Sequence, residues 1–359
     1  MDAVVEVIKS GWLAHGKYSK RLEELFCEFT GAKFATTVSN CTAGLHLTCQ
    51  AAGFGPGDEV IVPAQTHTAT AHAVEYTGAK AVFADVHPLT GNILVEEIED
   101  KLNSTTKGII PVHMAGYPCD MDGIIRICEK NNLLLIEDCA HALGTKFKDG
   151  HVGNFGLTGN FSFYPTKQIT TGEGGVVISN DESVMDFINK HKAFGIDTSP
   201  EMRTKPGTYD VQGLGYNFRM TDFQAALGVG QMERYGENLK IRRANGKLYC
   251  ELLSHSEYVE FPDYNDGNSF FLFQLLIKPP FTRDKVLFEL EEAGIGVSIH
   301  YATPVPLMTY YKDKYGYKHN DFPNAVQFGS QVISLPVGSK LSKDEIKFIS
   351  VEISKCLRH

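Results

Sequence analysis

The chain has 359 residues, of which 43% are hydrophobic and 21% charged, the balance of a folded globular protein rather than a disordered one. Its 34 Lys and Arg against 43 Asp and Glu give a net charge of −9, and no basic run stands out, which argues against nucleic acid as a partner. No stretch approaches the roughly 20 apolar residues that a membrane span needs, and the acidic start does not have the pattern of a signal peptide.

The first two thirds of the chain alternate short β-rich runs with amphipathic stretches. The β-rich runs predict strands at 34–38, 59–62, 81–84, 108–112, 133–136, 160–164 and 175–178. Helices are predicted among the earlier strands at 42–52, 69–76, 95–102 and 120–130. This alternation indicates an α/β fold with a mostly parallel sheet that is covered on both faces. In such sheets ligands bind at the carboxyl ends of the strands.

The last third of the chain has a different pattern. A helical pattern runs from Thr221 to about Leu253 and then gives way to shorter elements. Strands are predicted near 270–277 and 296–300, and helices near 283–292 and 343–356. At roughly 150 residues per domain, the length predicts about two domains. We therefore expect a large domain at 1–240 and a small C-terminal α+β domain at 241–359, linked by the long helix.

The eight cysteines are scattered along the chain without a C-x-x-C pair, so their spacing does not suggest zinc or a redox dithiol. A count this low in a chain this long is typical of reduced thiols in a cytoplasm. We expect most of them to be small buried apolar residues and the protein to be cytoplasmic.

The most informative stretch is 161–175, in which an apolar strand ends in a polar turn that carries Lys167 and a glycine cluster. A lone lysine in such a hairpin-like connection is usually exposed and without function. Three features favour a functional lysine: its place at a strand end, glycines that let the backbone approach a ligand closely, and Ser162 five positions earlier. A lysine near a buried cofactor can lose its proton far below its usual pKa of about 10.4 and form a Schiff base.

Polar residues also follow two earlier strands. Asp138 comes just after the apolar run 133–136, where an acid often caps a helix but can also hold the protonated pyridine nitrogen of pyridoxal 5'-phosphate (PLP). The run 38–45 places small polar residues between a strand and a helix start, where backbone N–H groups can bind a phosphate. The alternative for this run is an ordinary N-cap by Ser39 or Thr42.

Taken together and in order, these motifs resemble the DegT–StrS family of PLP-dependent sugar aminotransferases, which have fold type I of the aspartate aminotransferase superfamily. The resemblance runs through nearly the whole chain. It rests on SGWLAHG at 10–16, GPGDEVI at 55–61, GAK at 78–80, ED at 137–138, the segment 162–175, GYNFR at 215–219 and SIHY at 298–301. Similar proteins usually carry a short segment before the helix that precedes Ser10, and its absence here would mean a different start codon or a truncated sequence.

The resemblance implies a role for each residue of the cofactor site. Lys167 would form the Schiff base with PLP and move the proton between the substrate α-carbon and the cofactor. Asp138 would keep the pyridine nitrogen protonated, so that the ring acts as an electron sink. The backbone N–H groups of Thr42 and Ala43, with the Ser162 hydroxyl, would hold the cofactor phosphate.

Two histidines depart from the usual pattern of this family. His67 stands where Phe or Trp is common, and its imidazole can stack on the pyridine ring with less area than Trp. His141 stands where glutamine is frequent, near the expected cofactor O3′. Both changes put the pH dependence of the site in question. The alternative is that each histidine only satisfies a local hydrogen bond.

The remaining residues concern the substrate and the partner subunit. Asn217 matches a residue that reaches the phosphate from the neighbouring subunit, which implies a homodimer with shared active sites. His300 and Tyr301 match a pair that lies close to the sugar substrate. Arg219 is a candidate for pairing with a substrate carboxylate, although an Arg beside an aromatic residue is as often part of a structural ion pair.

The resemblance therefore implies a PLP-dependent aminotransferase of amino sugar and polysaccharide biosynthesis. It would move an amino group from L-glutamate to a keto-sugar, foremost a nucleotide-linked keto-deoxysugar, by a ping-pong mechanism through pyridoxamine phosphate (PMP), without a metal. The alternatives are a transaminase for a keto-cyclitol or a small ketose phosphate, a PLP-dependent sugar dehydratase, and a non-catalytic regulatory relative. Lys167 counts against the dehydratase, because such dehydratases have a histidine in place of the Schiff-base lysine. The presence of Lys167, Asp138 and Ser162 together counts against the regulatory relative, because a non-catalytic protein does not need all three.

Overall fold

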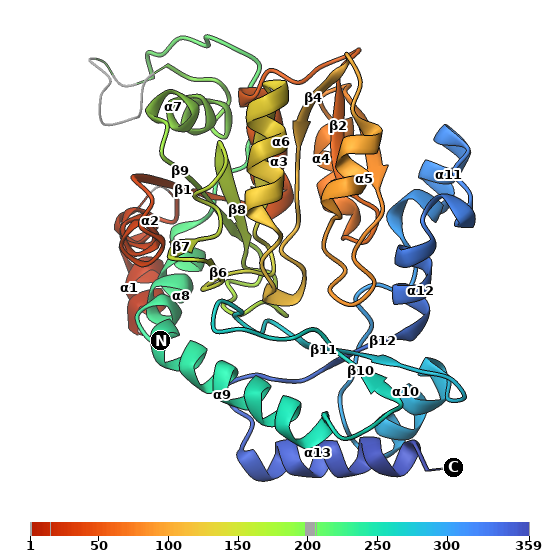
Figure 1. The fold of residues 1–359 in the computed structure, drawn as a ribbon. Coiled ribbons are helices and arrows are strands. Elements are labelled where there is room, and N and C mark those ends of the chain that lie inside the picture. The colour runs from red at the N-terminus through yellow and green to blue at the C-terminus, as the bar shows by residue number, and fades with distance from the viewer. Residues whose placement is uncertain (1, 15, 198–204, 206, 359) are drawn as a thin grey trace.

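The computed structural model describes residues 2–14, 16–197, 205 and 207–358, so His15 of the 10–16 motif lies outside the described residues. A seven-stranded sheet occupies the centre of the large part of the molecule, with the order β1-β9-β8-β5-β4-β2-β3 (Figure 1). Its strands are β1 (Phe34–Val38), β2 (Glu59–Pro63), β3 (Lys80–Ala84), β4 (Thr106–Ile109), β5 (Leu134–Asp138), β8 (Thr158–Ser162) and β9 (Gly175–Ser179).

The expected mostly parallel sheet is confirmed, with β9 as its one antiparallel strand. β9 pairs antiparallel with both β1 and β8, whereas the pairs among β8, β5, β4, β2 and β3 are parallel. Ser162 at the end of β8 lies opposite Gly175 at the start of β9. The connection between them has no helix, and a parallel return usually needs one. Lys167 therefore lies on a long hairpin connection.

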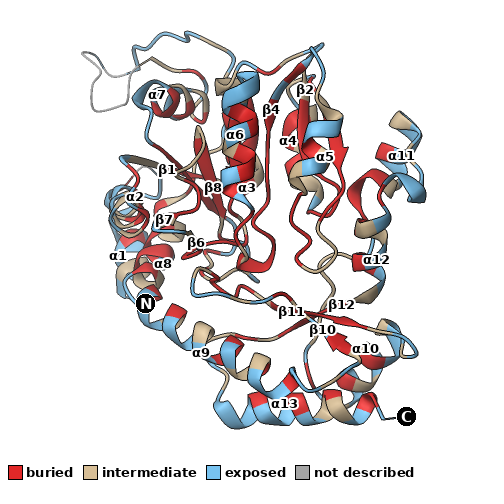
Figure 2. Ribbon diagram, viewed as in Figure 1, coloured by how far each residue is buried: buried red, intermediate tan, exposed pale blue. Residues whose placement is uncertain are grey.

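Helices cover both faces of this sheet, as the sequence predicts. They are α2 (Lys17–Thr30), α3 (Cys41–Ala51), α4 (Thr68–Glu75), α5 (Val95–Lys101), α6 (Met121–Asn131), α7 (Glu182–His191) and α8 (Asp222–Met232), while α1 (Asp2–Ser10) packs on α8. Val60 and Val62 of β2 pack with residues of α3 and α4, whereas Ile61 packs with residues of α5 and α6. This alternation explains the continuous apolar runs, because both faces of each central strand are buried (Figure 2).

The C-terminal part forms a second, smaller sheet. Its antiparallel strands are β10 (Val259–Glu260), β11 (Phe273–Ile277) and β12 (Val332–Leu335). The helices of this part are α10 (Arg283–Glu292), α11 (Thr309–Tyr315), α12 (Pro323–Gln331) and α13 (Lys343–Cys356), and a short hairpin of β6 (Lys146–Phe147) and β7 (Gly150–His151) belongs to the larger part. No helix among the described residues is both long and apolar enough to cross a membrane.

Two predicted elements are wrong. The helix expected at 221–253 is divided into two helices, α8 and α9 (Tyr235–Leu253). The two pack against different partners: α8 lies on α2, whereas α9 runs below the large sheet and packs on α13 (Figure 1). The strand expected at 296–300 is absent, and Ser298 makes only a single bridge to Ser334. The carbonyl of His300 accepts instead from the Gln274 side chain at 2.9 Å, so it takes no part in a strand ladder. The domain boundary at residue 240 falls inside α9 and stays a prediction.

Candidate active site

A cavity of about 690 Å³ lies at the carboxyl ends of the central strands β5 and β8. Most of the predicted site residues line it: Thr42, His67, Asp138, His141, Ser162, Lys167, His300 and Tyr301. Ala43, Asn217 and Arg219 are not among the described residues that line it. The fold therefore brings together residues from five segments that are far apart in the sequence. Four of them follow strands of the large sheet, as expected for a parallel sheet, and the fifth, at 300–301, comes from the C-terminal part.

Lys167 lies at the centre of this arrangement. Its backbone N–H donates to the Tyr164 carbonyl at 2.9 Å, and its Nζ lies 4.8 Å from the centroid of the Phe271 ring. Burial lowers the pKa of its amine to about 8, although the nearby Asp138 carboxylate acts in the opposite direction. A substantial share of the amine is therefore neutral near physiological pH, and the neutral form is the one that attacks a carbonyl.

The side chain of Gln168 holds the loop of Lys167 in place. Its Oε1 accepts from the Leu143 N–H at 3.1 Å, and its Nε2 lies 2.9 Å from the Leu143 carbonyl. The same Nε2 is 2.8 Å from the Tyr235 hydroxyl and 3.1 Å from the Ser269 Oγ. One amide thus ties the lysine loop to the β5–β6 turn, to α9 and to the segment that carries Phe271.

Gly175, the last glycine of the cluster after Lys167, serves the packing of the protein itself. A Cβ on Gly175 would lie 2.7 Å from the Phe161 carbonyl oxygen and 2.8 Å from the Cys41 backbone nitrogen. The close approach seen at Gly175 is to the backbone of the protein itself, and the expected approach of these glycines to a ligand stays a prediction. The absence of a side chain there lets β9 pass directly against the first residue of α3.

Asp138 is buried at the end of β5 and does not cap a helix, since no helix begins in the described turns that follow it. Its Oδ2 accepts from the Thr70 hydroxyl at 2.8 Å and its Oδ1 from the Ala140 N–H at 3.0 Å. Burial raises the pKa of this carboxyl, and the two hydrogen bonds and Lys167 oppose the rise. A protonated pyridine nitrogen would add the charged partner that a buried carboxylate needs, so the site fits PLP here.

Sequence reasoning missed Thr66 and Thr70, which hold that carboxylate in place. The two hydroxyl oxygens lie 2.8 Å apart, and since Thr70 donates to Asp138, Thr66 donates to Thr70. Thr70 lies in the first turn of α4 and Thr66 lies just before its N-cap, His67, so the available signal was only a polar cluster at the start of a helix that follows a strand.

The start of α3 has the properties expected of a phosphate site, with one correction. The side chain of Asn40 is the N-cap and accepts from the Ala43 N–H at 2.8 Å, so the alternative of a cap by Ser39 or Thr42 is wrong. That bond already uses the Ala43 N–H. Thr42 and Ser162 both line the cavity beside the positive end of the helix dipole. This donor set fits a phosphate.

His141 is neutral and hydrogen-bonded at both ring nitrogens. Its Nδ1 accepts from the Ala115 N–H at 3.4 Å, which assigns the ring proton to Nε2, 3.3 Å from the Tyr301 hydroxyl. Burial, reinforced by Lys167, holds its pKa well below the usual value. The Nδ1 of His67 accepts from the Ala69 N–H at 3.2 Å, and partial desolvation lowers the pKa of this imidazole too. Both histidines thus make local hydrogen bonds and line the cavity.

His300 and Tyr301 enter the cavity from the C-terminal part of the chain. The Nδ1 of His300 lies 3.2 Å from the Ser334 Oγ, and burial lowers the pKa of its imidazole to about 4. The Tyr301 carbonyl accepts from the Gln65 side chain at 2.6 Å, and burial raises the pKa of the Tyr301 hydroxyl. His300 and Tyr301 therefore present neutral polar groups to the cavity, and Ser334 and Gln65 hold this segment in place.

Three predicted residues lie elsewhere in this chain. Asn217 accepts from the Nε of Arg219 at 2.9 Å, and the Arg219 guanidinium lies 5.2 Å from the centroid of the Phe194 ring. Ala43 lines a neighbouring cavity of about 390 Å³, whose lining shares Asn40 and Thr42 with the first cavity. The site roles of these residues stay predictions.

Comparisons with known proteins agree over almost the full length of the chain. A sequence model described as the DegT/DnrJ/EryC1/StrS aminotransferase family matches residues 1–354. The spore coat polysaccharide biosynthesis protein SpsC of Bacillus subtilis is 36% identical, with 96% of this chain and 91% of SpsC covered. GDP-perosamine synthase of Escherichia coli O157:H7 is 35% identical, with 99% and 94% covered. Solved structures of Spr1654 from Streptococcus pneumoniae in its PLP and PMP forms match with TM-scores of 0.91 and 0.92, at 28% identity, over 99% of this chain and 95% of Spr1654.

Proposed function

Because this chain belongs to the DegT/DnrJ/EryC1/StrS aminotransferase family, we propose that it moves an amino group from L-glutamate to a nucleotide-linked keto-deoxysugar by a ping-pong mechanism. It is a PLP-dependent aminotransferase with the α/β architecture of fold type I, of the kind used in amino sugar and polysaccharide biosynthesis. The observation that carries the proposal is a partly neutral Lys167 that shares one cavity with the buried Asp138 and the start of α3. The printed name of GDP-perosamine synthase supports a nucleotide-linked acceptor.

Different residues of the cavity would hold different parts of the cofactor. When bound, PLP supplies an electron sink and carries the amino group. Asp138 would hold the proton of the pyridine nitrogen, and Thr42 and Ser162 would bind the phosphate at the start of α3. His67 would cover one face of the ring, and the Nε2–H of His141 would donate to O3′ in place of the Tyr301 hydroxyl, which it faces at 3.3 Å.

The substrate steps would use Lys167, His300 and Tyr301. The Lys167 amine would take the proton from the α-carbon of glutamate and later return one to the acceptor, because its pKa of about 8 allows both roles near neutral pH. His300 and Tyr301 would contact the sugar hydroxyls. Both are kept neutral by burial, which suits hydroxyl groups better than charged ones.

A homodimer with shared active sites completes the proposal. Asn217 and Arg219 lie outside the cavity of their own chain, so a role at a cofactor or a substrate would place them in the partner's cavity. All eight cysteines are free thiols, which supports a reducing cytoplasm as the location.

The visible spectrum of the PLP-loaded protein tests the reaction directly. We expect the band of bound PLP to collapse to that of PMP when L-glutamate is added and to return when the keto-sugar acceptor is added. A band that ignores glutamate would contradict the donor and favour the dehydratase or regulatory alternatives. Recovery with a keto-cyclitol or a ketose phosphate, but with no nucleotide-linked keto-sugar, would contradict the acceptor.

Mixed dimers test the shared site. Chains that carry Lys167→Ala and Asn217→Ala are co-expressed with different tags and purified as the heterodimer, and the transfer rate is measured at limiting PLP. If the two residues act in one site from opposite chains, one site of each heterodimer keeps both native side chains. We then expect about half of the wild-type activity per dimer, although each homodimer is impaired. A heterodimer no more active than its parents would defeat the shared site.

A further inference from the structure

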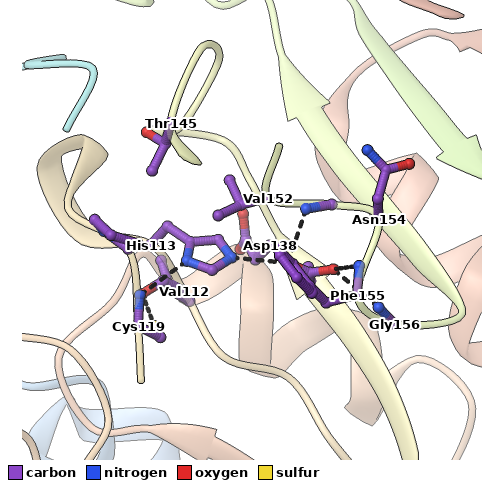
Figure 3. Close-up of polar contacts among 12 residues, drawn as sticks. Val112, His113, Cys119, Asp138, Thr145, Val152, Asn154, Phe155 and Gly156 are labelled. Atoms are coloured by element: carbon purple, nitrogen blue, oxygen red, sulfur yellow. Dashed lines mark hydrogen bonds and ion pairs between the residues drawn. The ribbon is translucent and has the colours of Figure 1, made fainter. Parts of the chain in front are cut away.

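A buried polar cluster surrounds Glu137, and Figure 3 labels three of its members, His113, Phe155 and Gly156. Glu137 precedes Asp138 on β5, and successive side chains of a strand point to opposite faces. The Glu137 carboxylate is fully buried. It accepts from the N–H of Gly153 at 2.7 Å, of Phe155 at 2.8 Å and of Gly156 at 3.0 Å. One turn of the backbone is thus bound to the end of β5.

His113 is the fourth donor to this carboxylate. Its Nε2 lies 3.1 Å from Glu137 Oε2, and its Nδ1 accepts from the Cys119 N–H at 3.1 Å, which assigns the ring proton to Nε2. The backbone N–H of His113 also donates to the Asp138 carbonyl at 3.3 Å. Glu137 therefore joins three segments at the strand end: β5, the turn at 153–156 and the connection at 112–119 (Figure 3).

The same cluster has the composition of a metal site, but its hydrogen bonds argue against one. The ligand atoms of His113, Glu137 and Cys139 lie within 4.8 Å of one another. Each oxygen of Glu137 already accepts two hydrogen bonds, and the His113 nitrogen that faces it carries a proton. Burial and the Glu137 charge hold the pKa of the Cys139 thiol well above its usual value, whereas a metal ligand must be a thiolate.

We infer that Glu137 is a positioning residue, which fixes the end of β5 and so holds the Asp138 carboxylate at the place where it meets the cofactor. This inference rests on the proposed role of Asp138. The Asp138 side chain accepts only from Thr70 and Ala140 among the described residues, so its position depends on its backbone. Loss of the Glu137 charge would leave buried N–H groups without an acceptor and let the strand end shift.

The test compares Glu137→Gln with Asp85→Asn. Asp85 is also a buried carboxylate, and it accepts from the N–H groups of Asn324 and Ala325 at 2.9 Å each, at the start of α12 and away from the residues that line the cavity. Both variants replace a buried carboxylate by an amide of the same shape. We expect both to unfold at lower denaturant, but only Glu137→Gln to bind PLP about tenfold more weakly. We also expect only Glu137→Gln to shift the pH midpoint of the bound-PLP spectrum.

Several outcomes would overturn the inference about Glu137. Equal PLP dissociation constants and pH midpoints in the two variants would overturn the inference, and so would one equivalent of metal per chain in the purified wild-type protein. If Glu137→Gln does not fold, His113→Leu removes one donor only, and we expect a smaller shift in the same direction. Asp138→Ala separates the two proposals: an unchanged PLP spectrum there contradicts the proposed function itself. If Asp138→Ala changes the PLP spectrum but Glu137→Gln alters neither the PLP dissociation constant nor the pH midpoint, only the inference about Glu137 is overturned.

Discussion

Replacement of Lys167 by alanine is expected to abolish amino transfer and the visible band of bound PLP, while the fold stays intact. The Lys167 side chain supplies a partly neutral amine to the cavity. The loop that carries Lys167 is held in place by the Gln168 side chain, so loss of the lysine side chain should not disturb the loop. The loss combines a nucleophile and a general base, and a general base alone contributes about 10²–10⁴ in rate. We expect at least about a 10⁴-fold loss in the glutamate half-reaction, followed by absorbance in a single turnover.

Lys192 offers a matched control for this variant. It is also a buried lysine whose pKa is lowered by burial, but its Nζ donates to the Thr37 carbonyl at 2.9 Å, outside the cavity. Lys192→Met should therefore cost stability and leave the PLP band unchanged. Substantial transamination by Lys167→Ala, or a band lost equally in Lys192→Met, would contradict the assignment of Lys167.

The pH dependence of PLP capture by the apoprotein gives a second measurement of the same group. Below a pKa of about 8 the Lys167 amine is mostly protonated, and the protonated amine cannot attack the aldehyde. The capture rate should therefore rise with pH and level off above about 8. A midpoint near the ordinary lysine value of about 10.4 would mean that the amine is not desolvated as the cavity implies.

The parts of the site that the sequence predicts are those set by local patterns. Strand ends followed by polar turns placed Asp138, Ser162 and Lys167 at one edge of a parallel sheet, and the structure brings them into one cavity. The resemblance to a known family placed His67 and His141 there as well. These positions depend on the order of strands and on short motifs, both of which can be read along the chain.

The parts that could not be predicted depend on docking between distant segments. Phe271 approaches Lys167 from 104 residues further along the chain (271 − 167 = 104), because the segment before β11 docks against the larger part. Its N–H donates to the Ala115 carbonyl at 3.1 Å. The break between α8 and α9 has the same origin, since it depends on which helices they pack against. No periodicity in a single sequence carries such information.

Replacement of Asp138 by alanine is the second large effect that we expect. Without a carboxylate the pyridine nitrogen would lose its proton near neutral pH, and the ring would no longer draw electrons from the α-carbon. The loss of one preorganised electrostatic contact usually costs about 10²–10³ in rate, so we expect the glutamate half-reaction to slow by at least about 100-fold.

Asp138→Asn separates the charge from the shape. The amide keeps an oxygen that can accept from Thr70 or from Ala140, the two present partners, but it carries no charge to hold a proton on the ring. If the charge matters, Asp138→Asn should be nearly as slow as Asp138→Ala, and the bound-PLP spectrum should report a deprotonated ring in both. An Asp138→Asn enzyme close to the wild-type rate would mean that this carboxylate only organises α4 and the turn after β5. The proton on the ring would then need another source.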